Sequence, residues 1–216
     1  MRLWRDEGLT VPVIAVNVSL IELKSSADFV LHVARTISKC RLSPPDIEFD
    51  VTEATLAQLT WAHSEVLPQL HKLGVKIAID DFGSEYSSFE YIRAYRVNHL
   101  KIAQSFIKKS THDPESAATI RAIVNFANDV GIGVIAQGVE TEQQRALLAA
   151  TDSTTRAQGF HFSKAVGAAR AGELLRQGYV SPQPHDGRLE DGTARHPAQP
   201  AATAPLKAEP GLAVEL

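Results

Sequence analysis

The sequence of 216 residues contains one cysteine, Cys40, and one methionine. A single cysteine excludes an internal disulfide and any zinc site built from several cysteines, and it fits a reducing compartment. We expect Cys40 to behave as a small buried hydrophobic residue. Since no covalent cross-link is available, the fold must rest on a hydrophobic core, and 44% hydrophobic residues are enough for one domain.

Long apolar runs and basic clusters are also absent. No run approaches the roughly 20 apolar residues that span a bilayer, and the N-terminal MRLWRDEGL lacks the apolar segment of a signal peptide. The 22 Lys and Arg residues are balanced by 25 Asp and Glu, which gives a formal net charge of −3 and no electrostatic footprint for nucleic acid. We therefore predict a soluble, cytoplasmic chain without a membrane or nucleic-acid partner.

The sequence does contain a regular alternation of short apolar and longer amphipathic segments. The apolar segments predict strands at residues 12–18, 46–51, 75–80, 98–103, 132–137 and 156–162. Helices are predicted at 27–40, 56–73, 87–94, 114–130 and 142–149, with a helix end near 4–8. Gly74 and Gly131 stand at expected helix C-caps, and Pro114 at a helix start. This alternation predicts an α/β fold with a parallel sheet, either doubly wound or closed as a TIM-type barrel.

The two ends of the chain differ from this pattern. Only six strands are visible, so a closed eight-stranded barrel would lack its first strand or strands. Residues 181–216 are dense in Pro, Ala and Gly without a periodic apolar face, and we predict that they are disordered. The expected organisation is therefore an incomplete β/α barrel over residues 1–180, followed by a tail over 181–216.

Polar residues end nearly every predicted strand. They are Asn17, Asp50, the adjacent pair Asp80 and Asp81, Lys101, Gln137 and Gln158. On neighbouring parallel strands, these side chains converge on one mouth of the fold. Amide and carboxylate oxygens suit Mg²⁺ or Mn²⁺, and an adjacent Asp pair can serve two ions or one ion and a water. Lys101 can then steady a phosphate or an attacking hydroxide.

Each of these residues also has a purely structural explanation. An Asp at a strand end is often the N-cap of the next helix, and Asp50 has that option in the segment DVTE. Asn17 alone is typical of a turn, Lys101 alone of a surface lysine, and Gln158 alone can satisfy backbone groups. Only the convergence of all of them favours a site.

The histidines show no metal-ligand spacing. We expect four of them to lie on the surfaces of helices or strands, namely His32, His63, His71 and His99. His161 lies beside the predicted mouth and is a weak candidate ligand.

The segments VNVS, DVTEA, IAIDDFGSEYSSFEYIRAYRVNHLKIAQSFI, VIAQGVETEQQ and QGFHFSKAV resemble, in order and spacing, the EAL-type cyclic di-GMP phosphodiesterases of bacteria. The resemblance covers about residues 3–166. It implies a modified TIM barrel that hydrolyses one phosphodiester bond of cyclic di-GMP with two Mg²⁺ or Mn²⁺ ions and a metal-bound water.

The resemblance also implies roles for individual residues. Asn17, Asp80 and Asp81 match metal-binding positions, with Asp81 also in the catalytic set. Lys101 matches the catalytic lysine that contacts the water, and Asp50 stands at the metal glutamate of the family's E-x-T-E motif.

Three further residues match supporting positions. Glu53 matches the glutamate that holds the loop after the Asp pair, a loop tied to metal binding and dimerisation. Glu140 matches the second acid of the E-G-V-E motif, and Gln158 a glutamine near the floor of the active site.

Several departures from the family pattern remove or displace negative charge, and the E-A-L motif itself has no counterpart. The carboxylate of Asp50 sits roughly 1.3–1.5 Å further back than that of the family's glutamate. Gln137 replaces the first acid of E-G-V-E, the degenerate base position, and an amide can neither accept that proton nor hold a cation by charge. Ala103 replaces the aspartate of the L-K-I-D motif.

These departures predict a catalytically impaired domain that binds cyclic di-GMP or acts as a protein-interaction module. Losing a general base commonly costs about 10²–10⁴-fold in rate. Two alternatives stay open, an active metal-dependent phosphodiesterase that releases linear pGpG, and a non-functional gene fragment. The sequence leaves a homodimer or a partner signalling domain equally open.

Overall fold

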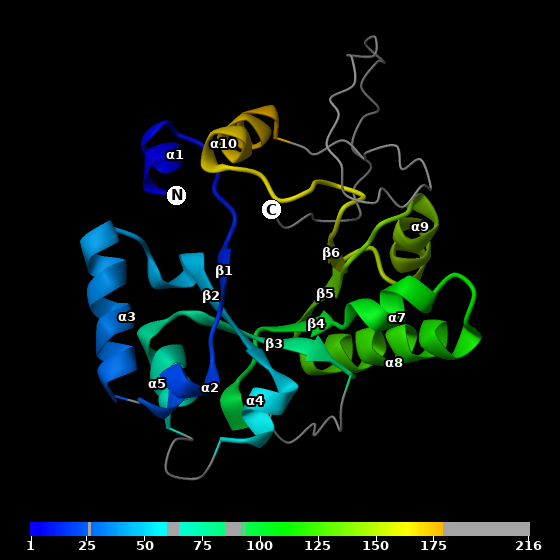
Figure 1. Ribbon diagram of the computed structural model, residues 1–216, viewed down its shortest axis with the longest axis horizontal. Helices are drawn as coiled ribbons and strands as arrows, with labels where there is room; N and C mark the ends of the chain where they lie inside the picture. The colour runs from blue at the N-terminus through cyan, green and yellow to red at the C-terminus, as the bar shows by residue number, and fades with distance from the viewer. Residues whose placement is uncertain (26, 60–64, 85–91, 93, 179–216) are drawn as a thin grey trace, which may run out of the picture.

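The computed structural model describes residues 1–25, 27–59, 65–84, 92 and 94–178. Within them, six parallel strands form one sheet in which chain order and spatial order coincide, and the sheet curves as a half-barrel (Figure 1). The strands are β1 (Ile14–Asn17), β2 (Ile47–Thr52), β3 (Lys76–Phe82), β4 (His99–Ile102), β5 (Gly133–Gln137) and β6 (Arg156–Gln158). The predicted α/β fold with partial TIM-barrel architecture is therefore confirmed.

Helices connect successive strands on the outer side of the sheet, and one further helix precedes the first strand and another follows the last. They are α1 (Arg2–Asp6), α2 (Leu20–Lys24), α3 (Ala27–Cys40), the 3₁₀ turn η1 (Pro44–Asp46), α4 (Glu53–Ala57), α5 (Val66–Leu73), α7 (Gln104–Lys109), α8 (Pro114–Val130), α9 (Glu142–Thr151) and α10 (Ala168–Gln177). Figure 1 shows α2 to α5 grouped at one end of the sheet and α7 to α9 at the other. Helices α1 and α10 lie together, and Arg176 Nη2 is 2.6 Å from Glu7 Oε2.

Local capping signals fix several helix boundaries. The Asp113 carboxylate accepts hydrogen bonds from the backbone N–H groups of Glu115 and Ser116 at 3.2 and 3.1 Å, so α8 begins at the predicted proline. Helices α5 and α8 end at Gly74 and Gly131, whose φ angles of 97° and 73° lie in the left-handed region that glycine enters without strain. The predicted C-caps are confirmed.

Other boundary predictions are wrong. The helix predicted at 56–73 has the wrong bounds. Helix α4 begins earlier, at Glu53, because Thr52 Oγ1 accepts from the Thr55 N–H at 3.2 Å, and it ends at Ala57, while α5 begins at Val66. The last strand ends at Gln158 rather than 162, since Gly159 turns against the backbone of Val139. Most of the helix predicted at 87–94, namely 87–91 and 93, and the whole predicted tail at 181–216 lie outside the described residues.

Cys40 was expected in the core, but it is exposed at the last residue of α3. Helices α2, α7 and α10 were not predicted. Helices α2 and α7 have only five and six residues, too few for a helical period, whereas α10 has ten and was missed. Among the described residues, no helix is long and apolar enough to cross a membrane.

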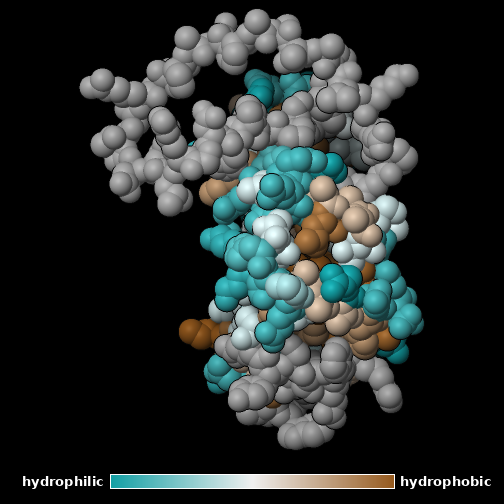
Figure 2. Space-filling view, turned by 90° about the vertical axis from the view of Figure 1, so that its right-hand side faces the viewer, coloured by the Kyte–Doolittle hydropathy of each residue, from teal (hydrophilic) through white to brown (hydrophobic). Residues whose placement is uncertain are grey.

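The hydrophobic core lies between the sheet and its outer helices. Strand alternation points Phe49 and Val51 of β2 into it, together with Leu100 and Ile102 of β4. Figure 2 views the molecule from the α8–α9 side, where hydrophilic side chains surround a smaller hydrophobic area. The alternate residues of the same strands form the other, concave face of the sheet, and that face carries the polar residues of the candidate site.

Candidate active site at the carboxyl ends of the strands

The sheet register brings the predicted strand-end residues together. Asn17 of β1 is in register with Asp50 of β2, and Gln137 of β5 with Gln158 of β6. Asp80 of β3 is in register with Thr52, at the end of β2. The carboxyl ends of the parallel strands thus meet along one edge, where α/β folds build their sites.

The adjacent Asp80 and Asp81 lie in an irregular part of β3. The register with β4 shifts between Ile79 and Phe82, and Asp81 has a φ of 53°, which is uncommon outside glycine. Adjacent side chains of a regular strand face opposite sides, but at this irregularity the charges of the two carboxylates still interact. Partial burial, and then the charge of Asp80, raise the pKa of Asp81.

Glu53 ties down the chain that follows the Asp pair. It lies in the first turn of α4, is buried, and accepts a hydrogen bond from the backbone N–H of Gly83 at 2.9 Å through Oε2. Gly83 has a φ of 92°, so this close approach uses the conformational freedom of glycine. Residues 85–91 of the loop lie outside the described part of the chain.

Lys101 and Asp50 form a buried ion pair. Lys101 is 1% exposed, and its Nζ donates to Asp50 Oδ2 at 2.8 Å. Lys101 is therefore no surface lysine, and Asp50 is no helix cap, because Thr52 caps α4. Burial raises the pKa of Asp50 to about 6, opposed by Lys101 and reinforced by the charges of Asp80 and Glu48.

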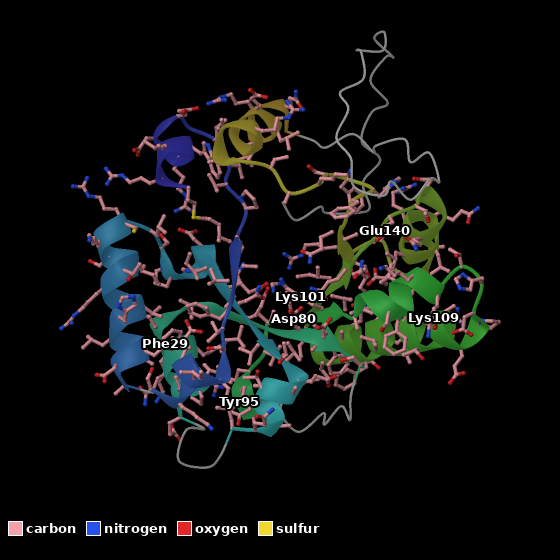
Figure 3. All side chains as sticks on the ribbon, in the orientation of Figure 1. Phe29, Asp80, Tyr95, Lys101, Lys109 and Glu140 are labelled. Carbon is pink, nitrogen blue, oxygen red and sulfur yellow. The ribbon has the colours of Figure 1, made fainter. Side chains whose placement is uncertain are left out.

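Gln137 contacts Asp80 across the mouth. Its Nε2 donates to Asp80 Oδ1 at 2.7 Å, so one oxygen of the Asp pair is engaged by an amide. Figure 3 shows Asp80 and Lys101 near the middle of the molecule and Glu140 farther out, toward α9. Glu140 Oε1 lies 3.4 Å from Gln104 Nε2 and 4.0 Å from Lys108 Nζ, so it belongs to the rim rather than to the central group.

The donor set fits a divalent cation only in part. Asp80, Asp81 and Asn17 offer oxygen ligands, and Asp50 Oδ1 is buried without a hydrogen-bond partner among the described residues. Yet in those same residues no three or more His, Cys, Asp or Glu side chains cluster as a metal site. Ala103, the buried N-cap residue of α7, adds no carboxylate.

An apolar cavity of about 650 Å³ opens beside Gln158. Its walls include Trp4 of α1, Ile14 of β1, Phe160 and Phe162 after β6, and Leu175 of α10. A cavity of this size accepts a small organic ligand, and the Gln158 amide is one of the few polar groups at its edge.

The sequence reasoning missed Glu48, His99 and Arg156. These residues lie on the concave face, and His99, predicted on a surface, is buried between Glu48 and Arg156. The expectation failed because it judged His99 by metal spacing alone. The signal was present as strand alternation, since each of the three residues stands two positions before Asp50, Lys101 or Gln158.

The other histidines contribute little to the site. His32 is exposed and His71 half-buried, and His63 lies outside the described residues. His161 is buried, with Nε2 3.2 Å from Glu142 Oε2, which places it against α9 rather than among the strand-end carboxylates.

Comparison with known proteins assigns the family. The sequence model of the EAL domain family matches residues 1–165 of this chain. Among curated relatives, the bifunctional diguanylate cyclase/cyclic di-GMP phosphodiesterase MucR of Pseudomonas aeruginosa is 38% identical over 148 residues, which are 68% of this chain and 22% of MucR. The chain spans about a fifth of the length of the curated relatives it matches.

Solved structures similar to this chain agree with the family match. The EAL domain of Mycobacterium smegmatis DcpA has a TM-score of 0.75 and 32% identity, over 82% of this chain and 79% of that one. A manganese and cyclic di-GMP complex of Klebsiella pneumoniae BlrP1 has a TM-score of 0.65 and 27% identity, over 70% of this chain and 38% of that one. The sequence match, the parallel half-barrel and these neighbours together show that the chain belongs to the EAL domain family.

Proposed function

We propose that this chain is an EAL domain of cyclic di-GMP signalling that binds the dinucleotide and hydrolyses it poorly. The contact between Gln137 and Asp80 carries the proposal. Gln137 Nε2 lies 2.7 Å from Asp80 Oδ1 and donates to it. A carboxylate at this position would add a negative charge that attracts a cation, whereas the amide adds an N–H donor. The site therefore keeps the shape of a phosphodiesterase centre with less charge to hold metal.

A divalent cation, Mg²⁺ or Mn²⁺, would be held by Asn17, Asp80 and Asp81 and would supply Lewis-acid stabilisation of charge on the phosphate. Hydrolysis also needs a group that contacts the phosphate or the water and a group that accepts a proton. Lys101 presents an ammonium to a phosphate oxygen or an attacking water, but its pairing with Asp50 at 2.8 Å occupies that ammonium in part. No described carboxylate replaces Gln137 as a proton acceptor at its position.

Substrate binding needs fewer of these groups than turnover does. The apolar cavity beside Gln158 offers aromatic and aliphatic walls to a nucleobase, and the cationic Lys101 offers charge to the phosphates. The same site can thus keep affinity for cyclic di-GMP while it loses transition-state stabilisation.

The test combines binding and turnover on the full chain. Titration calorimetry with cyclic di-GMP should show saturable binding, whereas incubation with cyclic di-GMP and Mn²⁺, followed by chromatography, should give linear pGpG at least about 10²-fold more slowly than the EAL domain of MucR. The Gln137→Glu variant should hydrolyse faster than wild type without reaching the MucR rate, since Asp50 and Ala103 remain. Arg145→Gln, which breaks an exposed ion pair on α9, is the control.

The second candidate is an active phosphodiesterase that releases linear pGpG. The strand-end placement of Asn17, the Asp pair, Lys101 and Gln158 favours it, because these side chains meet along one edge of the sheet. Metal-dependent pGpG formation at the MucR rate would establish this function and refute impaired hydrolysis. Absence of both binding and turnover would refute both candidates.

A further inference from the structure

A second polar layer lies on the concave face, one strand period before the strand-end residues. It consists of Glu48 on β2, His99 on β4 and Arg156 on β6, which are alternate strands of the sheet. Glu48 is 1% exposed and His99 is 7% exposed. Charged and polar groups at this depth lose hydration, so they are retained only where other groups bind them.

The contacts of His99 assign a hydrogen-bond role to each of its ring nitrogens. Arg156 Nη2 contacts His99 Nε2, and a guanidinium can only donate, so Nε2 must be the accepting nitrogen. Nδ1 then carries the hydrogen and donates to Glu48 Oε2. The two ring nitrogens of His99 therefore link Arg156 to Glu48.

Gly133 makes room for this arrangement. It lies on β5 in register with His99, and a Cβ at this position would collide with the imidazole ring and lie 3.5 Å from Arg156 Nη2. The strand between β4 and β6 thus carries no side chain where the ring and the guanidinium meet, and the contact across β5 depends on that glycine.

Glu48 has a second oxygen, and it faces Lys101. Oε1 is buried, lies 3.9 Å from Lys101 Nζ and has no hydrogen-bond partner among the described residues. Lys101 Nζ is therefore placed between two carboxylates, Asp50 at 2.8 Å and Glu48 at 3.9 Å. His99 holds Oε2 and so determines where Oε1 points.

We propose that Arg156, His99 and Glu48 form a positioning network that fixes the ammonium of Lys101 beside Asp50. A lysine side chain has four rotatable bonds, and one carboxylate defines its position less tightly than two do. The functional consequence, that ordered Lys101 strengthens cyclic di-GMP binding, rests on the proposed function above. The ordering of Lys101 itself does not.

Nuclear magnetic resonance on the full ¹⁵N-labelled chain tests the ordering. Wild type should show His99 as the Nδ1–H tautomer and a slowly exchanging ammonium signal from Lys101. Glu48→Gln keeps the shape and the acceptor of Glu48 but removes its charge, and it should shift or broaden the Lys101 signal. His99→Leu should do the same, whereas His99→Asn, whose amide N–H replaces Nδ1–H, should restore the signal. Arg145→Gln should leave it unchanged.

Titration with cyclic di-GMP supplies the functional arm. Glu48→Gln and His99→Leu should weaken binding by about tenfold, and His99→Asn by less. An unchanged Lys101 signal in Glu48→Gln, or an Nε2–H tautomer of His99 in wild type, would overturn the network. If His99→Leu does not fold, Glu48→Gln carries the test. Failure of wild type to bind the dinucleotide would refute the proposed function and leave the signals of His99 and Lys101 as the decisive readout.

Discussion

The two faces of strand β2 differ in the interactions that stabilise them. On β2, Phe49 and Val51 pack into the core under the outer helices, whereas Glu48 and Asp50 lie on the concave face. The outer face gains free energy from apolar burial, which is non-directional and accepts many combinations of similar volume. The concave face depends on specific partners, because a buried charge without its partner costs several kcal/mol.

This comparison predicts that the faces respond differently to substitution. Each substitution on the outer face should act locally and cannot be rescued by a distant change. On the concave face, removing one member of an ion pair should lower the free energy of unfolding more than removing both members, because the loss comes mainly from the charge left buried without its partner.

The largest effect is expected on the outer face, at Leu100. Its side chain is fully buried on β4, so Leu100→Ala should lower the free energy of unfolding by about 4 kcal/mol through lost burial and the cavity left behind. Urea denaturation measures this change. The control Val130→Ala, at a side chain 49% exposed on α8, should change stability by less than about 0.5 kcal/mol. Equal losses in both variants would contradict the assignment of the core.

Lys101→Met should give the next largest effect. It leaves the Asp50 carboxylate buried without its ammonium and should cost about 3 kcal/mol at pH 7. The double variant Lys101→Met with Asp50→Val should recover part of that loss, because neither charge then remains unpaired. Urea denaturation of the single variants and the double variant measures the coupling. Additive losses would show that the two residues act independently.

Gln137→Glu should have a smaller effect whose sign depends on metal. Without a divalent cation, the carboxylate of the variant repels Asp80, whereas the wild-type amide donates to it. The free energy of unfolding should therefore fall by about 1 kcal/mol, and the melting temperature should fall with it. Added Mn²⁺ should reverse this loss in the variant and change wild type less. Thermal denaturation with and without Mn²⁺ tests the sign. A variant that Mn²⁺ does not stabilise would count against a cation site at this edge.

The smallest effect is expected at the Arg5–Asp46 ion pair, outside both faces. The hydrogen bond from Arg5 lowers the pKa of Asp46 from 3.8, so its stabilisation is present above that pH and is lost as the pH falls toward the folded-state value. Asp46→Asn should cost about 0.5 kcal/mol at pH 7 and less at pH 3. Urea denaturation at both pH values checks this. A larger cost at pH 3 would reverse the predicted sign.

Much of the fold was predictable because its signals are local. Periodicity located the six strands to within a few residues, and Asp113, Pro114 and Gly131 marked both ends of α8. The failures came where one local signal overrode another. The Thr52 cap started α4 earlier than predicted, and the contact between Gly159 and Val139 ended β6 early.

For the candidate site, the strand-end positions of its residues were predictable from the sequence, but their contacts were not. Strand ends identified Asp50, Lys101 and Gln137, since their positions follow from the strand pattern. The sequence did not show that Lys101 pairs with Asp50 or that Gln137 donates to Asp80, because these contacts join residues 51 and 57 positions apart.

The sequence by itself determined the alternation of strands and helices, the caps and the residue types that end each strand, because these depend on neighbours a few positions away. The tertiary structure decided the partners. The bulge at Asp80 and Asp81 and the chain of contacts from Arg156 through His99 to Glu48 arise from strand register across the curved sheet. Register is set by the packing of the whole sheet, so no local segment encodes it.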